Sequence, residues 1–338
     1  MRGELSHGLP ELTTSGNRIV RADTAQPILL RGVNRSGLEY SEPGDAGFLA
    51  AAGITNEEVR EIVEAWGANI IRLPFNQDWA LHGRRSKSGE DYLTGIDQVI
   101  SWAAALGAYT ILDLQWLDAD TVYGHVKDQN GMAQDNHVAP TPNADTIELW
   151  RTLAGRYKDE PAVAFDLFNE PHDRLSDDSL PIHLLDEQDD VVESDVASVS
   201  PDDWSRWAAR LVQEIRAIRP SGIILVAGVD WAFDLRNVTV SGPGVVYSAH
   251  IYPDRKQSDW WKAIGRCDEI PTFIGEWGGG DKDLGFGSML AAVMNGKQLS
   301  WTAWSWVDDP KLVQPPGPPD YRPTAFGQLV RNELGSGA

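Results

Sequence analysis

Cysteine is almost absent from this chain, since Cys267 is the only one among 338 residues. A single cysteine excludes an internal disulfide bond and any metal centre built from several thiolates. It leaves open whether the protein works in an oxidising or a reducing compartment.

Long apolar runs are also missing. No stretch approaches the roughly 18 consecutive apolar residues of a membrane-spanning helix, so we expect no membrane partner. The first ten residues, MRGELSHGLP, lack the apolar segment of a signal peptide. We therefore expect a cytoplasmic protein if this chain is complete, and a secreted or periplasmic one if a signal peptide has been removed.

Basic residues are scarce. The chain has 29 Lys and Arg against 50 Asp and Glu, a net charge of -21. Such a surface repels phosphate backbones, so nucleic acid is not an expected partner. The 42% hydrophobic and 23% charged residues are typical of a globular protein and exclude a disordered chain.

Eight short β-rich runs alternate with segments of helical period. Near-continuous apolar runs of this kind are typical of parallel strands covered on both faces. The expected strands are 28–33, 69–75, 109–114, 163–168, 223–228, 245–250, 272–277 and 301–306.

The segments between the strands predict helices. Thr55 and Glu58 form a capping box at the start of one helix, and Gly67 ends it. An apolar stripe over 202–219 predicts another, which Pro220 stops. Between the fifth and sixth strands no helix is expected.

This alternation predicts an α/β fold, a (β/α)8 TIM barrel. Residues 13–27 are expected to form a short N-terminal β-hairpin at its base. Although the length also allows two domains, we expect residues 1–338 to form a single catalytic domain. Residues 172–203 hold 11 acidic residues and are expected to form a long acidic loop after strand 4.

Active sites of such barrels lie at the carboxyl ends of the strands. Polar and aromatic residues at those ends are Arg72, Gln115, Trp116, Asn169, Glu170, His250, Tyr252, Glu276 and Trp304. The two glutamates suggest glycoside hydrolysis, which needs one neutral carboxylic acid and one ionised carboxylate. Arg72 and Tyr252 near Glu276 would keep it ionised, as a nucleophile requires, and an enclosed Glu170 would have the raised pKa of a general acid.

One geometric difficulty concerns Asn169 and Glu170. Strict strand alternation sends neighbouring side chains to opposite faces, so a local bulge or twist is expected where these two residues meet the site.

Four segments carry a resemblance to a known family: FDLFNEPHD, VYSAHIYP, TFIGEWG and WTAWSW. In this order they resemble glycoside hydrolase family 5 of clan A, which holds many bacterial cellulases. The resemblance implies Glu170 as acid/base, Glu276 as nucleophile and retention of anomeric configuration. It also implies that Asn169 binds the sugar 2-hydroxyl, that Trp304 forms the sugar platform, and that Arg72, His250 and Tyr252 support the site.

One position departs from the family. Where the family usually has histidine after the third strand, this chain has Gln115, within Leu112-Asp113-Leu114-Gln115-Trp116. An amide donates and accepts hydrogen bonds but carries no titrating proton. We expect Gln115 and Trp116 to contact the sugar, and Asp113 to be a structural hydrogen-bonding group.

The expected activity is therefore retaining hydrolysis of a β-linked polysaccharide or oligosaccharide, most simply β-1,4-glucan, by a monomer without cofactor or metal. A mannanase, an exo-acting β-glycosidase or a transglycosylase of the same family remains an alternative, as does a non-catalytic sugar-binding barrel. A metal-dependent hydrolase would need paired histidines after an early strand, which this sequence does not have.

Overall fold

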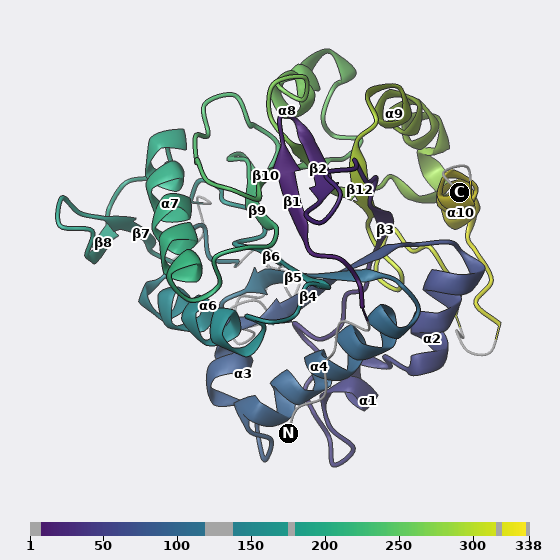
Figure 1. The fold of residues 1–338 in the computed structure, drawn as a ribbon, viewed down its shortest axis with the longest axis horizontal. Coiled ribbons are helices and arrows are strands. Elements are labelled where there is room, and N and C mark those ends of the chain that lie inside the picture. Colours follow the sequence, from purple (N-terminus) through teal and green to yellow (C-terminus); the bar gives the residue numbers. More distant parts are fainter. Residues whose placement is uncertain (1–7, 119–137, 175–179, 316–319, 336–338) are drawn as a thin grey trace, which may run out of the picture.

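Eight parallel strands close into a barrel in the computed structural model, which describes residues 8–118, 138–174, 180–315 and 320–335 (Figure 1). Their order around the barrel is β10-β11-β12-β3-β4-β5-β6-β9. The strands are β3 (Arg31–Asn34), β4 (Ile70–Asn76), β5 (Tyr109–Trp116), β6 (Val163–Asp166), β9 (Ile224–Ala227), β10 (Val245–Ile251), β11 (Thr272–Trp277) and β12 (Ser300–Ala303). The predicted TIM barrel is confirmed, and each strand overlaps its predicted run. β3 begins three residues later than predicted, while β6 and β12 end two and three residues earlier.

Helices surround this barrel. The α-helices in the described part of the chain are α1 (Phe48–Ala52), α2 (Asn56–Arg60), α3 (Gln77–His82), α4 (Gly89–Ala105), α6 (Ala144–Arg156), α7 (Pro201–Ile218), α8 (Trp261–Ile264), α9 (Leu284–Lys297) and α10 (Ala325–Gly335). None of them combines the length and the apolarity that crossing a bilayer requires. As expected, no helix lies between β9 and β10.

The capping box predicted at α2 is only half formed. The Thr55 side chain accepts a hydrogen bond from the Glu58 backbone N–H at 3.2 Å, as predicted. The Glu58 carboxylate does not return to Thr55; it is buried and accepts from Arg35 Nε at 2.7 Å and Trp306 Nε1 at 3.0 Å. An ion pair with a buried arginine outweighs a solvent-facing cap, so the glutamate turns inward.

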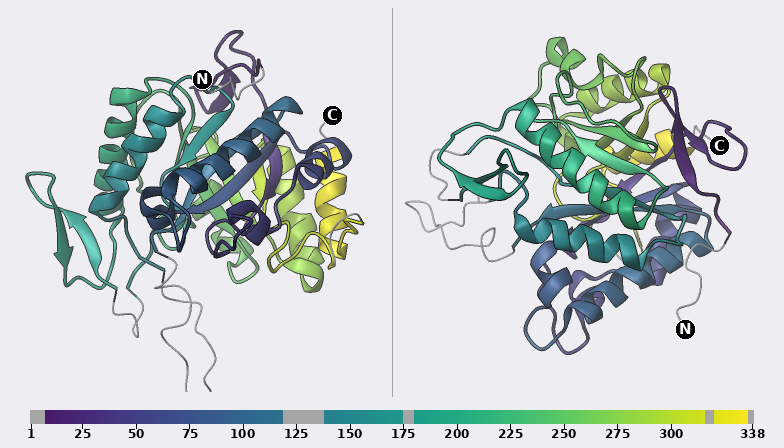
Figure 2. Two further views of the ribbon diagram at one scale, coloured as in Figure 1. Left: turned by 90° about the horizontal axis from the view of Figure 1, so that it is seen from below. Right: turned by 60° about the vertical axis from the view of Figure 1, so that its left-hand side comes forward.

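The predicted hairpin is present at the amino-terminal end of the barrel. Strands β1 (Leu12–Ser15) and β2 (Arg18–Arg21) pair antiparallel, and Gly16 takes a left-handed φ of 56° in the turn. Leu12 and Ile19 pack on apolar residues from the starts of the barrel strands. The hairpin therefore seals the base of the barrel, at the end opposite to the active-site loops (Figure 2).

The acidic segment 172–203 is not a plain loop, which corrects that prediction. It contains a second antiparallel hairpin, β7 (Ile182–Leu185) with β8 (Val191–Ser194), while residues 175–179 lie outside the described residues. Ile182 and Leu185 are buried, whereas Val192 is 40% exposed. The hairpin projects from the barrel wall beside α7 (Figure 2).

Candidate active site

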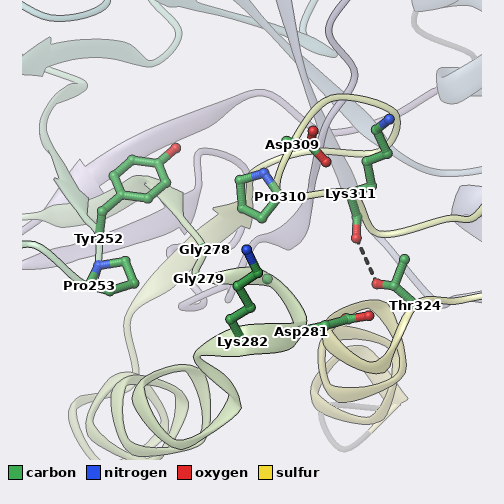
Figure 3. A pocket seen from close by; sticks show the side chains of 11 residues that line it. Tyr252, Pro253, Gly278, Gly279, Asp281, Lys282, Asp309, Pro310, Lys311 and Thr324 are labelled. Carbon is green, nitrogen blue, oxygen red and sulfur yellow. Dashed lines mark hydrogen bonds between the residues drawn. The ribbon is translucent and has the colours of Figure 1, made fainter.

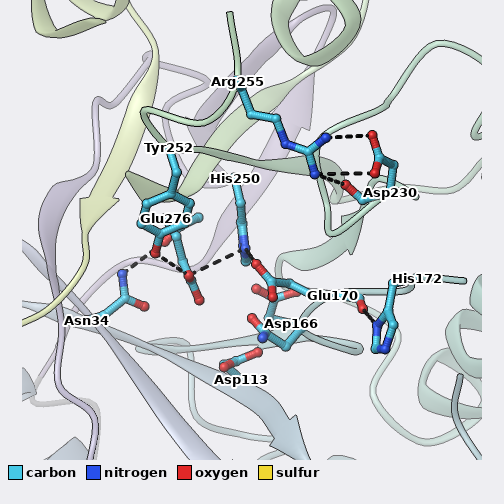
Figure 4. A network of polar contacts seen from close by, with 12 residues as sticks. Asn34, Asp113, Asp166, Glu170, His172, Asp230, His250, Tyr252, Arg255 and Glu276 are labelled. Carbon is cyan, nitrogen blue, oxygen red and sulfur yellow. Dashed lines mark hydrogen bonds and ion pairs between the residues drawn. The ribbon is translucent and has the colours of Figure 1, made fainter. Parts of the chain in front are cut away.

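The site lies where the barrel strands end. Of the predicted residues, the structure joins Arg72, Asn169, Glu170, His250, Tyr252 and Glu276 in one network of polar contacts, in which His250 Nδ1 lies 3.6 Å from Glu276 Oε2. Figure 4 shows Glu170, His250, Tyr252 and Glu276 of this network. These side chains come from β4, the segment after β6, β10 with the residue just beyond it, and β11.

Glu276 is held by two donors and is almost fully buried. Arg72 Nη1 donates to its Oε1 at 2.8 Å, and the Tyr252 hydroxyl donates to its Oε2 at 2.7 Å. Burial raises the pKa of Glu276 above its ordinary value, and the neighbouring His250, Arg72 and Tyr252 oppose that rise. Both expected partners are present, but burial outweighs them in setting the direction of the shift.

The backbone just before Glu276 is fixed by two neighbouring strands. The carbonyl of Gly275 accepts from Thr302 Oγ1 at 2.6 Å and from Asn34 Nδ2 at 3.0 Å. A Cβ atom on residue 275 would lie 2.9 Å from His250 Nε2 and 2.5 Å from Ser248 Oγ. Glycine is therefore required for the His250 ring to pack beside this strand.

Glu170 lies opposite, hydrogen-bonded to His250. Its Oε1 is 2.8 Å from His250 Nδ1, and its side chain is 21% exposed, so that it borders the solvent cleft. Burial raises the pKa of Glu170 to about 7, opposed by Arg72 and Arg255. Burial also lowers the pKa of His250 to about 4. At neutral pH His250 is therefore uncharged, and a single hydrogen joins it to Glu170.

The two glutamates face each other closely. One carboxylate oxygen of Glu170, one of Glu276 and a ring nitrogen of His250 all lie within 4.8 Å of one another. Inverting glycosidases separate their carboxyl groups by roughly 6.5–9.5 Å to admit a water, whereas retaining ones need about 5–5.5 Å. The observed spacing suits the retaining arrangement.

Asn169 and Glu170 reach the site without a bulge in their strand. Strand β6 ends at Asp166, so the residues after it leave the pleat and its alternation. The Asn169 backbone N–H donates to the Leu114 carbonyl on β5 at 3.0 Å, while Asn169 Oδ1 accepts from Arg72 Nη2 at 2.9 Å. The buried Trp150 of α6 holds the intervening turn by donating to the Leu167 carbonyl at 3.1 Å.

Gln115 and Trp116 line a cavity beside Glu170. This cavity of about 200 Å³ is also bordered by Asn169 and Trp231. The Gln115 Oε1 atom is buried there without a hydrogen bond in the described structure. A buried acceptor without a donor is costly, so the site is suited to a ligand that supplies one.

A second, larger cavity is bordered by Tyr252, whose hydroxyl donates to Glu276. It measures about 650 Å³ and lies between Tyr252, the glycine-rich turn 278–280 after β11, and residues 309–311 after β12 (Figure 3). One cavity therefore borders Glu170, and the other borders Tyr252, the hydrogen-bond partner of Glu276.

The tryptophans at the strand ends differ in exposure. Trp304 follows β12, is partly exposed, and donates its backbone N–H to the Trp277 carbonyl at 3.0 Å; no described contact joins it to either glutamate. Trp306 and Trp277 are fully buried. The ring of Trp277 packs in the barrel wall, where Trp301 and Phe326 contact it edge to face.

Two functional-site residues escaped the sequence analysis. Asp166 on β6 accepts from Arg72 Nε at 3.0 Å, and Asn34 on β3 accepts from Arg72 Nη1 at 2.9 Å. An aspartate inside an apolar strand was a usable signal, because a fully buried carboxylate requires a partner. Asn34 lies at a strand end and gave no comparable signal.

The chain matches a known family profile along most of its length. The profile described as Cellulase (glycosyl hydrolase family 5) covers residues 23–310. Endoglucanase MaCel5A of Microbulbifer sp. is 24% identical over 322 residues, covering 90% of this chain and 52% of the relative. An endoglucanase of Paenibacillus polymyxa is 25% identical, covering 86% and 78%. The chain thus spans about half the length of the first of these relatives.

Solved structures share the fold. A β-glucanase of Saccharophagus degradans in complex with cellotetraose has a TM-score of 0.72 and 22% identity, over 100% of this chain and 97% of that one. The catalytic domain of Thermobifida fusca endoglucanase Cel5A has a TM-score of 0.70 and 19% identity, over 98% and 100%.

Proposed function

Because the chain belongs to glycosyl hydrolase family 5, we propose that it hydrolyses β-linked glucan with retention of anomeric configuration, with Glu276 as nucleophile and Glu170 as acid/base. One observation carries the proposal. One oxygen of Glu170 and one of Glu276 lie within 4.8 Å of each other, and the two carboxylates have different environments, Glu276 between two donors and Glu170 beside a neutral histidine.

In the first step a Glu276 oxygen attacks the anomeric carbon as the glycosidic bond breaks. Arg72 and Tyr252 favour the ionised carboxylate that this attack needs. Glu170, with a pKa of about 7, transfers its proton to the departing oxygen. The leaving alcohol departs neutral, and the sugar stays bound to Glu276 as an ester.

In the second step Glu170, now a carboxylate, takes a proton from a water molecule. The water oxygen attacks the anomeric carbon from the face that the leaving group vacated, and the bond to Glu276 breaks. Two inversions give net retention. Glu170 regains its proton, so both residues return to their starting states.

Two separate cavities border the site, one at Glu170 and one at Tyr252, the partner of Glu276, and this arrangement favours internal cleavage of a chain. A substrate that occupies both the cavity at Tyr252 and the one at Gln115 has sugar units on each side of the broken bond. The relatives are named endoglucanases, and one solved neighbour holds cellotetraose. We therefore favour endo-acting cleavage of β-1,4-glucan by one monomeric catalytic domain.

Product analysis tests this function. The protein is incubated with β-1,4-glucan, β-1,3-glucan, mannan, xylan and cello-oligosaccharides, and the anomeric configuration of fresh product is followed by NMR. We expect β-configured oligosaccharides from β-1,4-glucan, and a loss of viscosity before reducing sugar accumulates. An α-configured first product would overturn retention. Binding without turnover on every substrate would favour the sugar-binding barrel.

Metal-dependent hydrolysis is a second candidate only because Glu170, His250 and Glu276 offer three atoms within 4.8 Å. The Arg72 guanidinium lies 2.8 Å from Glu276 and repels a cation there. We therefore expect full activity after prolonged treatment with a chelator. Loss of activity that added metal restores would favour the metal site.

A further inference from the structure

Three buried carboxylates share one guanidinium beneath the active site. Arg72 lies 2.8 Å from Glu276, 3.0 Å from Asp166 and 2.8 Å from Asp113. The side chains of Arg72, Asp113 and Asp166 are at most 1% exposed, and that of Glu276 is 5% exposed. The double-displacement mechanism uses Glu276 but assigns nothing to the two aspartates.

The two aspartates are register partners. Asp113 on β5 pairs with Asp166 on β6 in the parallel ladder, so both side chains point to the same face of the barrel wall. Asp166 Oδ1 and both oxygens of Asp113 are buried and accept no hydrogen bond from the described residues. Arg72 Nη2 is near Asp113 Oδ1, but only Nε of this guanidinium makes a well-directed hydrogen bond to an aspartate.

The net charge of these four side chains disfavours full ionisation of all three carboxylates. Three ionised carboxylates and one arginine would place a net charge of -2 inside the barrel, with the nearby His250 uncharged. Burying uncompensated charge costs several kcal/mol per ion. A proton between the aspartates removes one charge and gives their unused oxygens a hydrogen bond.

We propose that Asp113 and Asp166 hold one proton between them and act as a single negative charge on Arg72. Through Arg72, this pair is a positioning element for Glu276. With one proton between them, the two aspartates carry a single negative charge, so Arg72 contacts two anions, the pair and Glu276, instead of three. Its Nη1 group therefore binds Glu276 without a third anion competing for it.

The surroundings of Asp113 agree with a retained proton. Burial raises the pKa of Asp113 well above its ordinary value; Arg72 opposes this, and Asp166, Glu276 and the buried Glu39 add to it. The one cation in this set already serves three carboxylates. Among the described residues, Arg72 is the only cation that opposes the raised pKa of Asp113.

Infrared spectroscopy tests the proton directly and does not depend on the proposed activity. At about pH 9, Glu170 and Glu39 are ionised because their pKa values are about 7 and about 8. We expect the folded protein to show a carboxylic-acid carbonyl component that is lost in both Asp113→Asn and Asp166→Asn. The buried Glu58 and Glu276, whose pKa values are also raised, are common to all three proteins and cancel in the difference spectra. The exposed Glu187→Gln should leave the component unchanged. Difference spectra in which neither aspartate replacement removes a carboxylic-acid component would overturn the proposal.

A double-mutant cycle tests the role of the pair and rests on the proposed function. Each single Asn variant retains one aspartate that can ionise, so we expect kcat to fall by about tenfold or less. The double variant removes the negative charge of the pair, so Glu276 is the only carboxylate of the three that still contacts Arg72. We expect kcat to fall at least about 100-fold further than the product of the two single effects. If the kcat loss in the double variant equals the product of the two single losses, the aspartates act as two independent charges, and the shared charge is overturned. If the double variant does not fold, the infrared result decides.

Discussion

The His250 ring nitrogen Nδ1 and the Glu170 carboxylate oxygen Oε1 lie 2.8 Å apart, although the two residues are 80 positions apart in the chain. Because burial holds the pKa of His250 near 4, the imidazole stays neutral while Glu170 gains and loses a proton. A neutral partner adds no charge that would keep Glu170 ionised. The contact therefore orients the acid/base without removing its proton.

The pH dependence of turnover should follow Glu170. Its pKa is raised to about 7, so the protonated acid is present below that pH and is lost as the pH rises through it. We expect kcat/KM on cello-oligosaccharides to fall above about pH 7. An aryl glycoside with a good leaving group needs no proton and should show a weaker decline. If kcat/KM falls equally above pH 7 for both substrates, Glu170 is not the general acid.

Replacing the nucleophile should stop the reaction. Glu276→Gln keeps the size of the side chain but removes the carboxylate that attacks the anomeric carbon, so we expect turnover to fall to background on every substrate. The exposed Glu187→Gln is the matched control and should behave like the starting protein. Activity within tenfold of the control in Glu276→Gln would disprove the nucleophile assignment.

Removing the acid should be less damaging when the leaving group is activated. In Glu170→Ala we expect azide to restore part of the turnover of a good-leaving-group substrate, because glycosylation then needs no proton and azide replaces water at the ester. The product should be a β-glycosyl azide, identified by NMR. Rescue of Glu276→Gln instead, with an α-azide product, would exchange the two roles.

Gln115 should contribute through hydrogen bonding. Its buried Oε1 is available in the cavity beside Glu170, so we expect Gln115→Ala to lower kcat/KM by roughly ten-fold or more. Gln115→His, which restores the residue usual in the family, should retain substantial activity. Gln188→Ala, at an exposed glutamine, serves as the control. Unchanged activity in Gln115→Ala would show that this position has no direct part in catalysis.

Stability at alkaline pH should depend on Glu39. This buried residue accepts the Gly37 N–H at 2.6 Å, and burial raises its pKa to about 8. The folded state therefore binds a proton that the unfolded state releases above about pH 4.5, and the free energy of unfolding falls as pH rises towards 8. Glu39→Gln should flatten this decline, with a higher Tm than the starting protein at pH 9. Parallel Tm profiles from pH 5 to 9 would contradict the shift.

The sequence by itself determined the order of strands and helices and the residues that end the strands. Apolar runs report local burial; Pro220 cannot continue a helix, and Gly67 is a favoured residue at a helix end. These are properties of neighbouring residues. Because all parallel strands of a barrel end at one face, Glu170 and Glu276 could be assigned to one site before any contact was known.

Only the tertiary structure decided which side chains meet. Arg72 was predicted to keep Glu276 ionised. Barrel closure also places Asp113 and Asp166 against its guanidinium. The same closure buries Trp277 in the barrel wall. Local periodicity predicts which face of a strand a side chain lies on. The partners of a buried charge depend instead on the register between strands, which brings residues distant in the chain together. Distance across the barrel, not position in the chain, therefore set the chemistry of the site.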